Sequence, residues 1–126
     1  MLYLSSSLVR QACAAARAAH PNEALALLQG RKEDNGDIVV DRLLIPPGLS
    51  VNGSSAHFLP WMLPTGMDHI GVFHSHPAGS ARPSLADVRA SEHEGGVSLI
   101  ISFPYAPSSL RAYRPDGTPV EYQIKD

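Results

Sequence analysis

Residues 70–87 read IGVFHSHPAGSARPSLAD. The apolar run Ile70–His76 predicts a buried strand, and the Gly, Ser and Pro residues that follow it predict a loop. Pro83 and Ser84 are typical of a helix start, which predicts a helix from Pro83 to about His93. This stretch therefore places a strand, a loop and a helix in succession, with two histidines where the strand ends.

The chain before this stretch predicts one helix and one hairpin. Ser5–Ser7 offers hydroxyl groups for an N-cap, and the Ala-rich run after it predicts a helix from about residue 6 to 19, which Pro21 ends. Two apolar runs, Glu23–Gly30 and Ile38–Ile45, flank a turn sequence that reads DNGD. Such a turn between two apolar runs predicts a β-hairpin.

The chain after this stretch predicts three further strands. They are expected at Val97–Phe103, Leu110–Tyr113 and Val120–Ile124, with a turn at Pro115–Gly117 joining the last two. Two helices among six or seven short strands imply an α/β fold, in which the helices pack on a mixed β-sheet.

The composition is that of one ordinary globular domain. The chain has 126 residues, a net charge of −2 and 44% hydrophobic residues, so we expect residues 1–126 to form a single domain. Cys13, the one cysteine, is expected on a helix face of small residues, and its isolation favours a cytoplasmic protein. The near-neutral charge argues against nucleic acid as a partner, and the short apolar runs argue against a membrane span.

His74 and His76 form the feature that carries chemistry. Because side chains alternate between the two faces of a strand, both imidazoles point the same way and can share one metal ion. Catalytic zinc typically takes three protein ligands and keeps a fourth position for water. Asp87, in the first turn of the predicted helix, is the best placed third ligand.

Each part of this pattern also has a simpler interpretation. A histidine pair on a strand can be held by ordinary hydrogen bonds, and Ser84-x-x-Asp87 is by itself a capping box at a helix N-terminus. The spacing His-x-His, seven residues, Ser, two residues and Asp favours the metal site as the reading of the whole. The other histidines lack ligand spacing.

This combination resembles the motif of the JAMM (JAB1/MPN/Mov34) zinc metalloprotease family, which is an upstream Glu followed by H-S/T-H-x7-S-x2-D. The run from His74 to Asp87 fits that motif without a gap, and nearly the whole chain is similar to the small archaeal members. The resemblance implies a curved, mixed sheet of the cytidine-deaminase-like type.

The resemblance also implies a role for each matching residue. His74, His76 and Asp87 are implied to bind Zn²⁺, which lowers the pKa of a bound water toward ~7 and polarises the scissile carbonyl. Glu23 is implied to be the general base that takes the proton of the water. Ser84 is implied to support the tetrahedral intermediate, aided by the positive end of the helix dipole.

The function implied is that of a zinc-dependent isopeptidase or peptidase, resembling a deubiquitinase or desampylase. It would hydrolyse the bond after the C-terminal tail of a ubiquitin-like modifier. One alternative is a hydrolase that processes the C-terminus of a sulfur-carrier protein, and another is a non-catalytic MPN interaction module stabilised by zinc. The expected partner is a ubiquitin-like or sulfur-carrier protein with a small-residue tail.

The segment His57–Leu63 predicts an irregular or edge strand, because Pro60 cannot donate a ladder hydrogen bond. An extended modifier tail could pair with such an edge, which would place Trp61 in a substrate groove. The alternative is that Trp61 belongs to the core or to a dimer contact.

Overall fold

The structure, a computed structural model, describes residues 1–44, 70–94 and 96–126. In chain order the elements are β1 (Leu2–Leu4), α1 (Ser6–Ala19), β2 (Leu25–Lys32), β3 (Ile38–Leu44), β4 (Gly71–His76), α2 (Leu85–Glu94), β5 (Val97–Ser102), the 3₁₀ helix η2 (Pro107–Ser109), β6 (Arg111–Tyr113), β7 (Pro119–Val120) and β8 (Tyr122–Ile124).

The described strands form one eight-stranded sheet in the order β7-β6-β5-β4-β2-β3-β1-β8. The sheet is mixed, because β4 runs parallel to β5 and β1 runs parallel to β3 and β8, while the remaining pairs are antiparallel. Its two outermost strands, β7 and β8, are separated in the chain by Glu121 alone. The sheet must therefore curve until its edges approach each other, which agrees with the curved, mixed sheet that the resemblance implied.

The last predicted strand is wrong in one respect. Instead of one strand over Val120–Ile124, the chain forms β7, which pairs with β6, and then β8, which pairs with β1 on the other edge. The interruption lets the C-terminus cross between the two edges. Strand β1 was not predicted, because its three residues are too few for an alternating pattern to be recognised.

The N-terminal half confirms the predicted helix and hairpin. α1 covers the expected residues, and the Ser5 hydroxyl oxygen accepts a hydrogen bond from the Leu8 N–H at 3.0 Å. This N-cap satisfies one of the amide groups that the first turn of a helix leaves unpaired. β2 and β3 pair antiparallel up to Lys32 and Ile38, on either side of the predicted turn.

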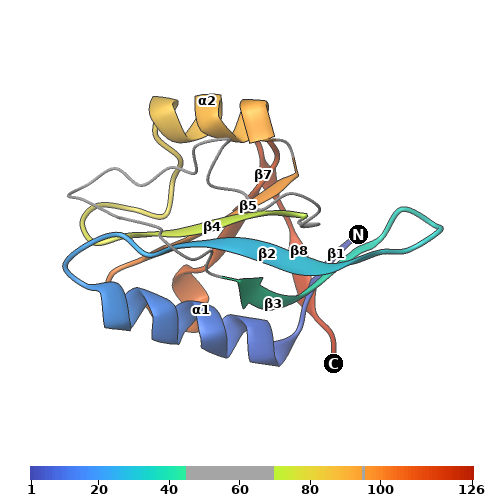
Figure 1. The fold of residues 1–126 in the computed structure, drawn as a ribbon, viewed down its shortest axis with the longest axis horizontal. Helices are drawn as coiled ribbons and strands as arrows, with labels where there is room; N and C mark the ends of the chain where they lie inside the picture. The colour runs from blue at the N-terminus through green and yellow to red at the C-terminus, as the bar shows by residue number, and fades with distance from the viewer. Residues whose placement is uncertain (45–69, 95) are drawn as a thin grey trace.

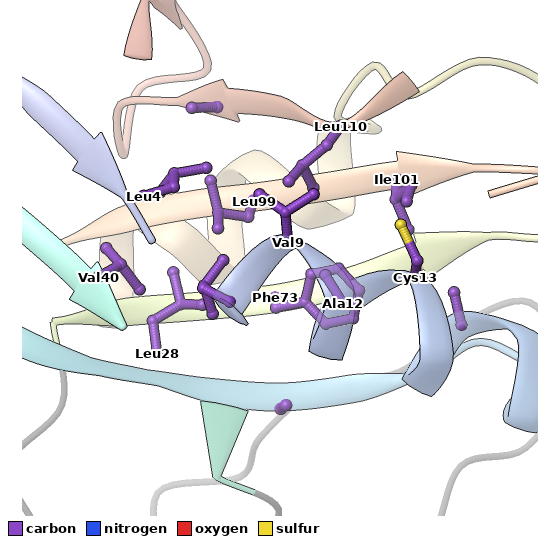
Figure 2. Packing of buried hydrophobic residues seen from close by; sticks show 14 of the residues in the cluster. Leu4, Val9, Ala12, Cys13, Leu28, Val40, Phe73, Leu99, Ile101 and Leu110 are labelled. Carbon is purple, nitrogen blue, oxygen red and sulfur yellow. The ribbon is translucent and has the colours of Figure 1, made fainter. Parts of the chain in front are cut away.

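The main core lies between α1 and one face of the sheet (Figure 2). The helix buries Ala12 and Cys13, whose small side chains let it lie close to β4 and β5. Phe73 from β4 and Ile101 from β5 are fully buried beneath it. Figure 2 shows the Phe73 ring against Ala12 and the Cys13 sulfur beside Ile101. The expected position of Cys13 on a packed helix face is confirmed.

The sheet separates α1 from α2, which lies on its other side (Figure 1). β4, α2 and β5 form a crossover unit in which the two strands are parallel neighbours. The carboxyl ends of parallel strands meet at one edge of a sheet, and the helix that follows a strand begins there. His76 ends β4 at this edge, and Asp87 lies in the first turn of α2.

Two further expectations concern other parts of the chain. The segment His57–Leu63, with Trp61, lies outside the described residues. Among the described helices, none is both long enough and apolar enough to cross a membrane.

Candidate metal centre

His74, His76 and Asp87 converge at the end of β4. The Nε2 atoms of the two histidines lie 3.1 Å apart, and Oδ2 of Asp87 lies 3.3 Å from Nε2 of His74 and 3.2 Å from Nε2 of His76. The three side chains are only 7–12% exposed. In the part of the chain that the structure describes, this is the group of His, Cys, Asp or Glu side chains with the geometry for a metal ion.

The ligand triangle has the dimensions that zinc requires. Donor atoms at ~2.0–2.1 Å from a tetrahedral zinc lie ~3.3 Å from one another, which is close to the three separations observed here. Two imidazole nitrogens and one carboxylate oxygen are a donor set that zinc uses in catalytic sites. The residues present therefore fit a zinc ion.

A backbone carbonyl orients the His76 imidazole for metal binding. Nδ1 of His76 lies 2.8 Å from the carbonyl oxygen of Ser80, in the loop between β4 and α2. Because a carbonyl oxygen only accepts hydrogen bonds, Nδ1 must carry the proton. In the neutral ring, Nε2 is then left with its lone pair free, as a metal ligand requires.

The capping box predicted as the alternative is also present. The Ser84 N–H donates to Oδ2 of Asp87 at 2.9 Å, and the Asp87 N–H donates to the Ser84 hydroxyl oxygen at 3.1 Å. The carboxylate oxygen that caps α2 is the same atom that lies beside both histidines. Capping and ligand geometry are thus two roles of one side chain, and the cap fixes its direction.

Glu23 approaches the same edge of the sheet from β2. The register pairs Leu25 with His74, and the Ser75 N–H donates to the Ala24 carbonyl at 3.2 Å. One residue further along, Glu23 lies near enough to His76 for its charge to act on that imidazole. Glu23 is buried, with 7% of its surface exposed, and it precedes β2 rather than opening it as the sequence predicted.

The electrostatics of the site favour a positive charge between its carboxylates. Burial opposes ionisation of Asp87, but the interactions of the carboxylate with the His74 and His76 imidazoles outweigh it and hold the pKa of the carboxyl well below its usual range. The hydrogen bond to Asp87 raises the pKa of His76 against the effect of burial, and the negative charge of Glu23 acts in the same direction.

Comparison with known proteins identifies the kind of site. Residues 5–116 match the family described as prokaryotic homologs of the JAB domain. The chain belongs to the prokaryotic JAB/MPN (JAMM) family. It is 34% identical over 112 residues to a Haloferax volcanii protein named "Probable metalloprotease", an alignment that covers 85% of this chain and 69% of that protein.

Solved structures agree with this assignment over the whole chain. A JAB1/MPN domain protein from Archaeoglobus fulgidus is 29% identical with a TM-score of 0.75, covering 100% of this chain and 98% of its own. A structure described as "JAMM: A Metalloprotease-like Zinc Site in the Proteasome and Signalosome" is 31% identical with a TM-score of 0.73, covering 100% and 99%. The predicted family, fold and enzyme class, a JAMM-type metalloprotease, are confirmed.

The structure brings every predicted residue of the JAMM motif to one place. His74, His76 and Asp87 form the ligand triangle, Ser84 caps the helix that carries Asp87, and Glu23 lies just before the neighbouring strand β2. Their individual roles stay predictions. Placing Glu23 depended on the resemblance, because a Glu two residues after a helix-ending proline has no spacing signal of its own.

Two contacts of the JAMM site involve groups that the sequence analysis did not single out. The Ser80 carbonyl holds His76, but every residue has a backbone carbonyl, so the sequence does not indicate this contact. The Ser75 hydroxyl oxygen accepts a hydrogen bond from the Ala24 N–H at 2.8 Å, and Ser75 is fully buried. A serine between two histidines in an otherwise apolar strand was the available signal for this second contact.

Proposed function

We propose that this chain is a zinc-dependent peptidase or isopeptidase that hydrolyses the bond after the C-terminal tail of a ubiquitin-like modifier. The observation that carries the proposal is the convergence of His74, His76 and Asp87, at zinc-like separations, beside the buried Glu23. The family to which the chain belongs and the name of its Haloferax volcanii relative support the reaction class.

Two imidazoles and one carboxylate hold the metal in this proposal. His74 and His76 each supply an imidazole nitrogen, and Asp87 supplies one negative charge from a helix end that fixes its direction. When bound, zinc supplies a Lewis acid for the scissile carbonyl and lowers the pKa of water to about 7 at this position. The protein then needs a proton acceptor and a donor for the developing oxyanion.

Glu23 is the proton acceptor. Glu23 is buried, and its negative charge acts on His76, one of the three residues of the ligand triangle. A carboxylate held there can take the proton of the attacking water and deliver it to the leaving amine. This single group would serve both proton transfers, so the chain needs no nucleophilic side chain and forms no acyl-enzyme.

Ser84 is the donor for the oxyanion. Its hydroxyl oxygen accepts the Asp87 N–H, so the hydroxyl proton stays available, and the residue is exposed. The position at the N-terminus of α2 adds the positive end of the helix dipole. Negative charge that develops on the carbonyl oxygen would therefore be stabilised on this side.

Replacing Ser84 separates its two roles. Ser84→Ala should lower kcat by about 10²–10³-fold with zinc content unchanged, since the loss of one oxyanion donor has that size. The lost N-cap should cost about 1 kcal/mol of stability. Ser84→Thr, which keeps the hydroxyl, is the matched control and should retain most of the activity. A Ser84→Ala variant that turns over substrate at the normal rate would remove Ser84 from the mechanism.

A panel of fusions tests the proposed substrate class. The zinc-loaded chain is incubated with a ubiquitin-like protein joined through its diglycine tail to a reporter, once by a peptide bond and once through a lysine side chain. A sulfur-carrier protein with a C-terminal extension and a fusion with valines in place of the glycines complete the set. Mass spectrometry identifies the bond that is cut.

The proposal predicts cleavage after the diglycine in both modifier fusions and little cleavage of the valine fusion. Cleavage of the sulfur-carrier fusion alone would favour the alternative of C-terminal processing. Tight zinc binding without hydrolysis of any member of the panel would contradict the proposal and favour the non-catalytic interaction module.

A further inference from the structure

Ser75 accepts a hydrogen bond that has no part in the mechanism proposed above. It lies between the two histidines in β4, but side chains alternate along a strand, so its hydroxyl points to the opposite face from the imidazoles. It is fully buried and reaches across to the residue just before β2, where its oxygen accepts the Ala24 N–H at 2.8 Å. The Ser75 N–H donates in turn to the Ala24 carbonyl at 3.2 Å.

This pair of hydrogen bonds changes how β2 begins. In a regular antiparallel ladder, two hydrogen-bonded residues exchange both of their N–H and C=O groups. Here the Ala24 N–H goes to the Ser75 side chain, so a hydroxyl takes the place of the ladder carbonyl. The ladder proper starts one residue later, at Leu25 opposite His74.

The consequence falls on Glu23. A peptide unit is planar, so the Ala24 N–H and the Glu23 Cα belong to one rigid group. Fixing the N–H therefore fixes the position of the Glu23 Cα atom, from which the side chain extends, and leaves rotation about the Glu23 Cα–C bond and the side-chain torsions as its remaining freedom. Glu23 directly precedes this anchored amide and is buried, although it lies outside the regular strand that pairs with β4.

We propose that Ser75 is a positioning residue for Glu23. This inference rests on the proposed function, in which Glu23 moves the proton of the attacking water. Ser75 takes no part in the chemistry, since its hydroxyl lies on the face of β4 away from the ligand triangle. By accepting the Ala24 N–H, Ser75 sets the position of Glu23 relative to His74 and His76, which lie on the same strand as Ser75.

The competing role is a merely structural one. Ala24 is buried, and its N–H needs an acceptor whatever Glu23 does. Loss of that acceptor would then lower stability and leave the chemical step unchanged. The two roles differ in whether the effect of Ser75 on kcat depends on the presence of Glu23.

A double-mutant cycle between the two residues decides between these roles. Ser75→Ala should lower kcat by about 10- to 100-fold, because a catalytic group displaced by about an ångström loses activity of that order. KM and zinc content should stay within about twofold of wild type, since the substrate contacts and the ligand triangle are unchanged. In a Glu23→Ala background, the same change at Ser75 should alter kcat by less than about twofold.

Ser75→Thr is the matched variant. It keeps a hydroxyl acceptor at the same position and should restore most of the kcat that Ser75→Ala loses. Hydrogen exchange of the Ala24 amide, followed by NMR on the zinc-loaded chain, reads the contact independently of activity. That amide should exchange at least several-fold faster in Ser75→Ala than in wild type or Ser75→Thr, because one hydrogen bond is lost.

The possible failures are distinguishable. If the wild-type chain hydrolyses no fusion in the panel, the proposed function fails, and the positioning role fails with it. If the wild type is active and a folded Ser75→Ala variant is equally active, or loses as much again in the Glu23→Ala background, only the positioning role of Ser75 is overturned. If Ser75→Thr is folded and holds zinc but recovers no kcat, the hydroxyl contact is likewise overturned.

Discussion

Asp87→Asn should reduce the zinc affinity of the chain by more than about 100-fold and abolish hydrolysis. Asn keeps the size of the side chain and an oxygen that can still accept the Ser84 N–H, so helix α2 keeps its cap. It removes the negative charge that lies 3.2–3.3 Å from both imidazoles. Losing only a hydrogen-bond partner of a metal ligand typically costs 10- to 100-fold in affinity, and a lost ligand should cost more.

Metal analysis after gel filtration measures this effect directly. Asp34→Asn, an exposed carboxylate in the turn between β2 and β3, is the matched control and should hold zinc as the wild type does. His74→Ala and His76→Ala should behave as Asp87→Asn does. A full complement of zinc in Asp87→Asn would show that Asp87 only caps the helix, which is the simpler reading of its sequence context.

Glu23→Gln should retain zinc and lose about 10²–10⁴-fold in kcat, the usual contribution of a positioned proton acceptor. The amide has the shape of the carboxylate but cannot take a proton from water at neutral pH. Because Glu23 supplies none of the three ligand atoms of the triangle, the metal content should stay near one zinc ion per chain. The combination of full zinc and lost turnover distinguishes this residue from the ligands.

Glu121→Gln serves as the control for this change. Glu121 is exposed between β7 and β8, away from the end of β4 that carries the ligands. Its replacement should leave kcat and zinc content as they are in the wild type. Near-normal turnover in Glu23→Gln, with the variant folded and zinc bound, would assign the proton transfer to another group.

Local sequence signals account for the parts of the fold that positioned the site. The Ala-rich run after Ser5 gave α1, and the apolar runs around the DNGD turn gave the β2–β3 hairpin. The run Ile70–His76 gave β4, and the Ser84-x-x-Asp87 pattern placed the start of α2. Each of these depends on contacts within a few residues, which a sequence displays directly.

Long-range pairing accounts for what the sequence did not reveal. β7 and β8 belong to opposite edges of the sheet, a division that depends on partners more than a hundred residues away at β1. The placement of Glu23 beside His76 depends on the register of β2 against β4. Register is fixed by the packing of whole faces, so a pattern read along one strand does not display it.

In the candidate site, too, local features were predicted and long-range contacts were not. The ligand spacing was readable, because His74, His76 and Asp87 lie within one strand, loop and helix start. The groups that hold His76 and Glu23 in place could not be predicted from the sequence. The Ser80 carbonyl belongs to the backbone, and the Ser75 hydroxyl contacts the Ala24 amide, which lies in another part of the chain.

Zinc titration of the metal-free chain tests the central claim most directly. Zinc is added in steps, and bound metal and hydrolysis of the modifier fusion joined by a peptide bond are measured on the same samples. Hydrolysis should rise in proportion to bound zinc and level off at about one ion per chain, in keeping with one ligand triangle. Hydrolysis by the metal-free chain, or a fully loaded chain that cuts nothing, would contradict the account.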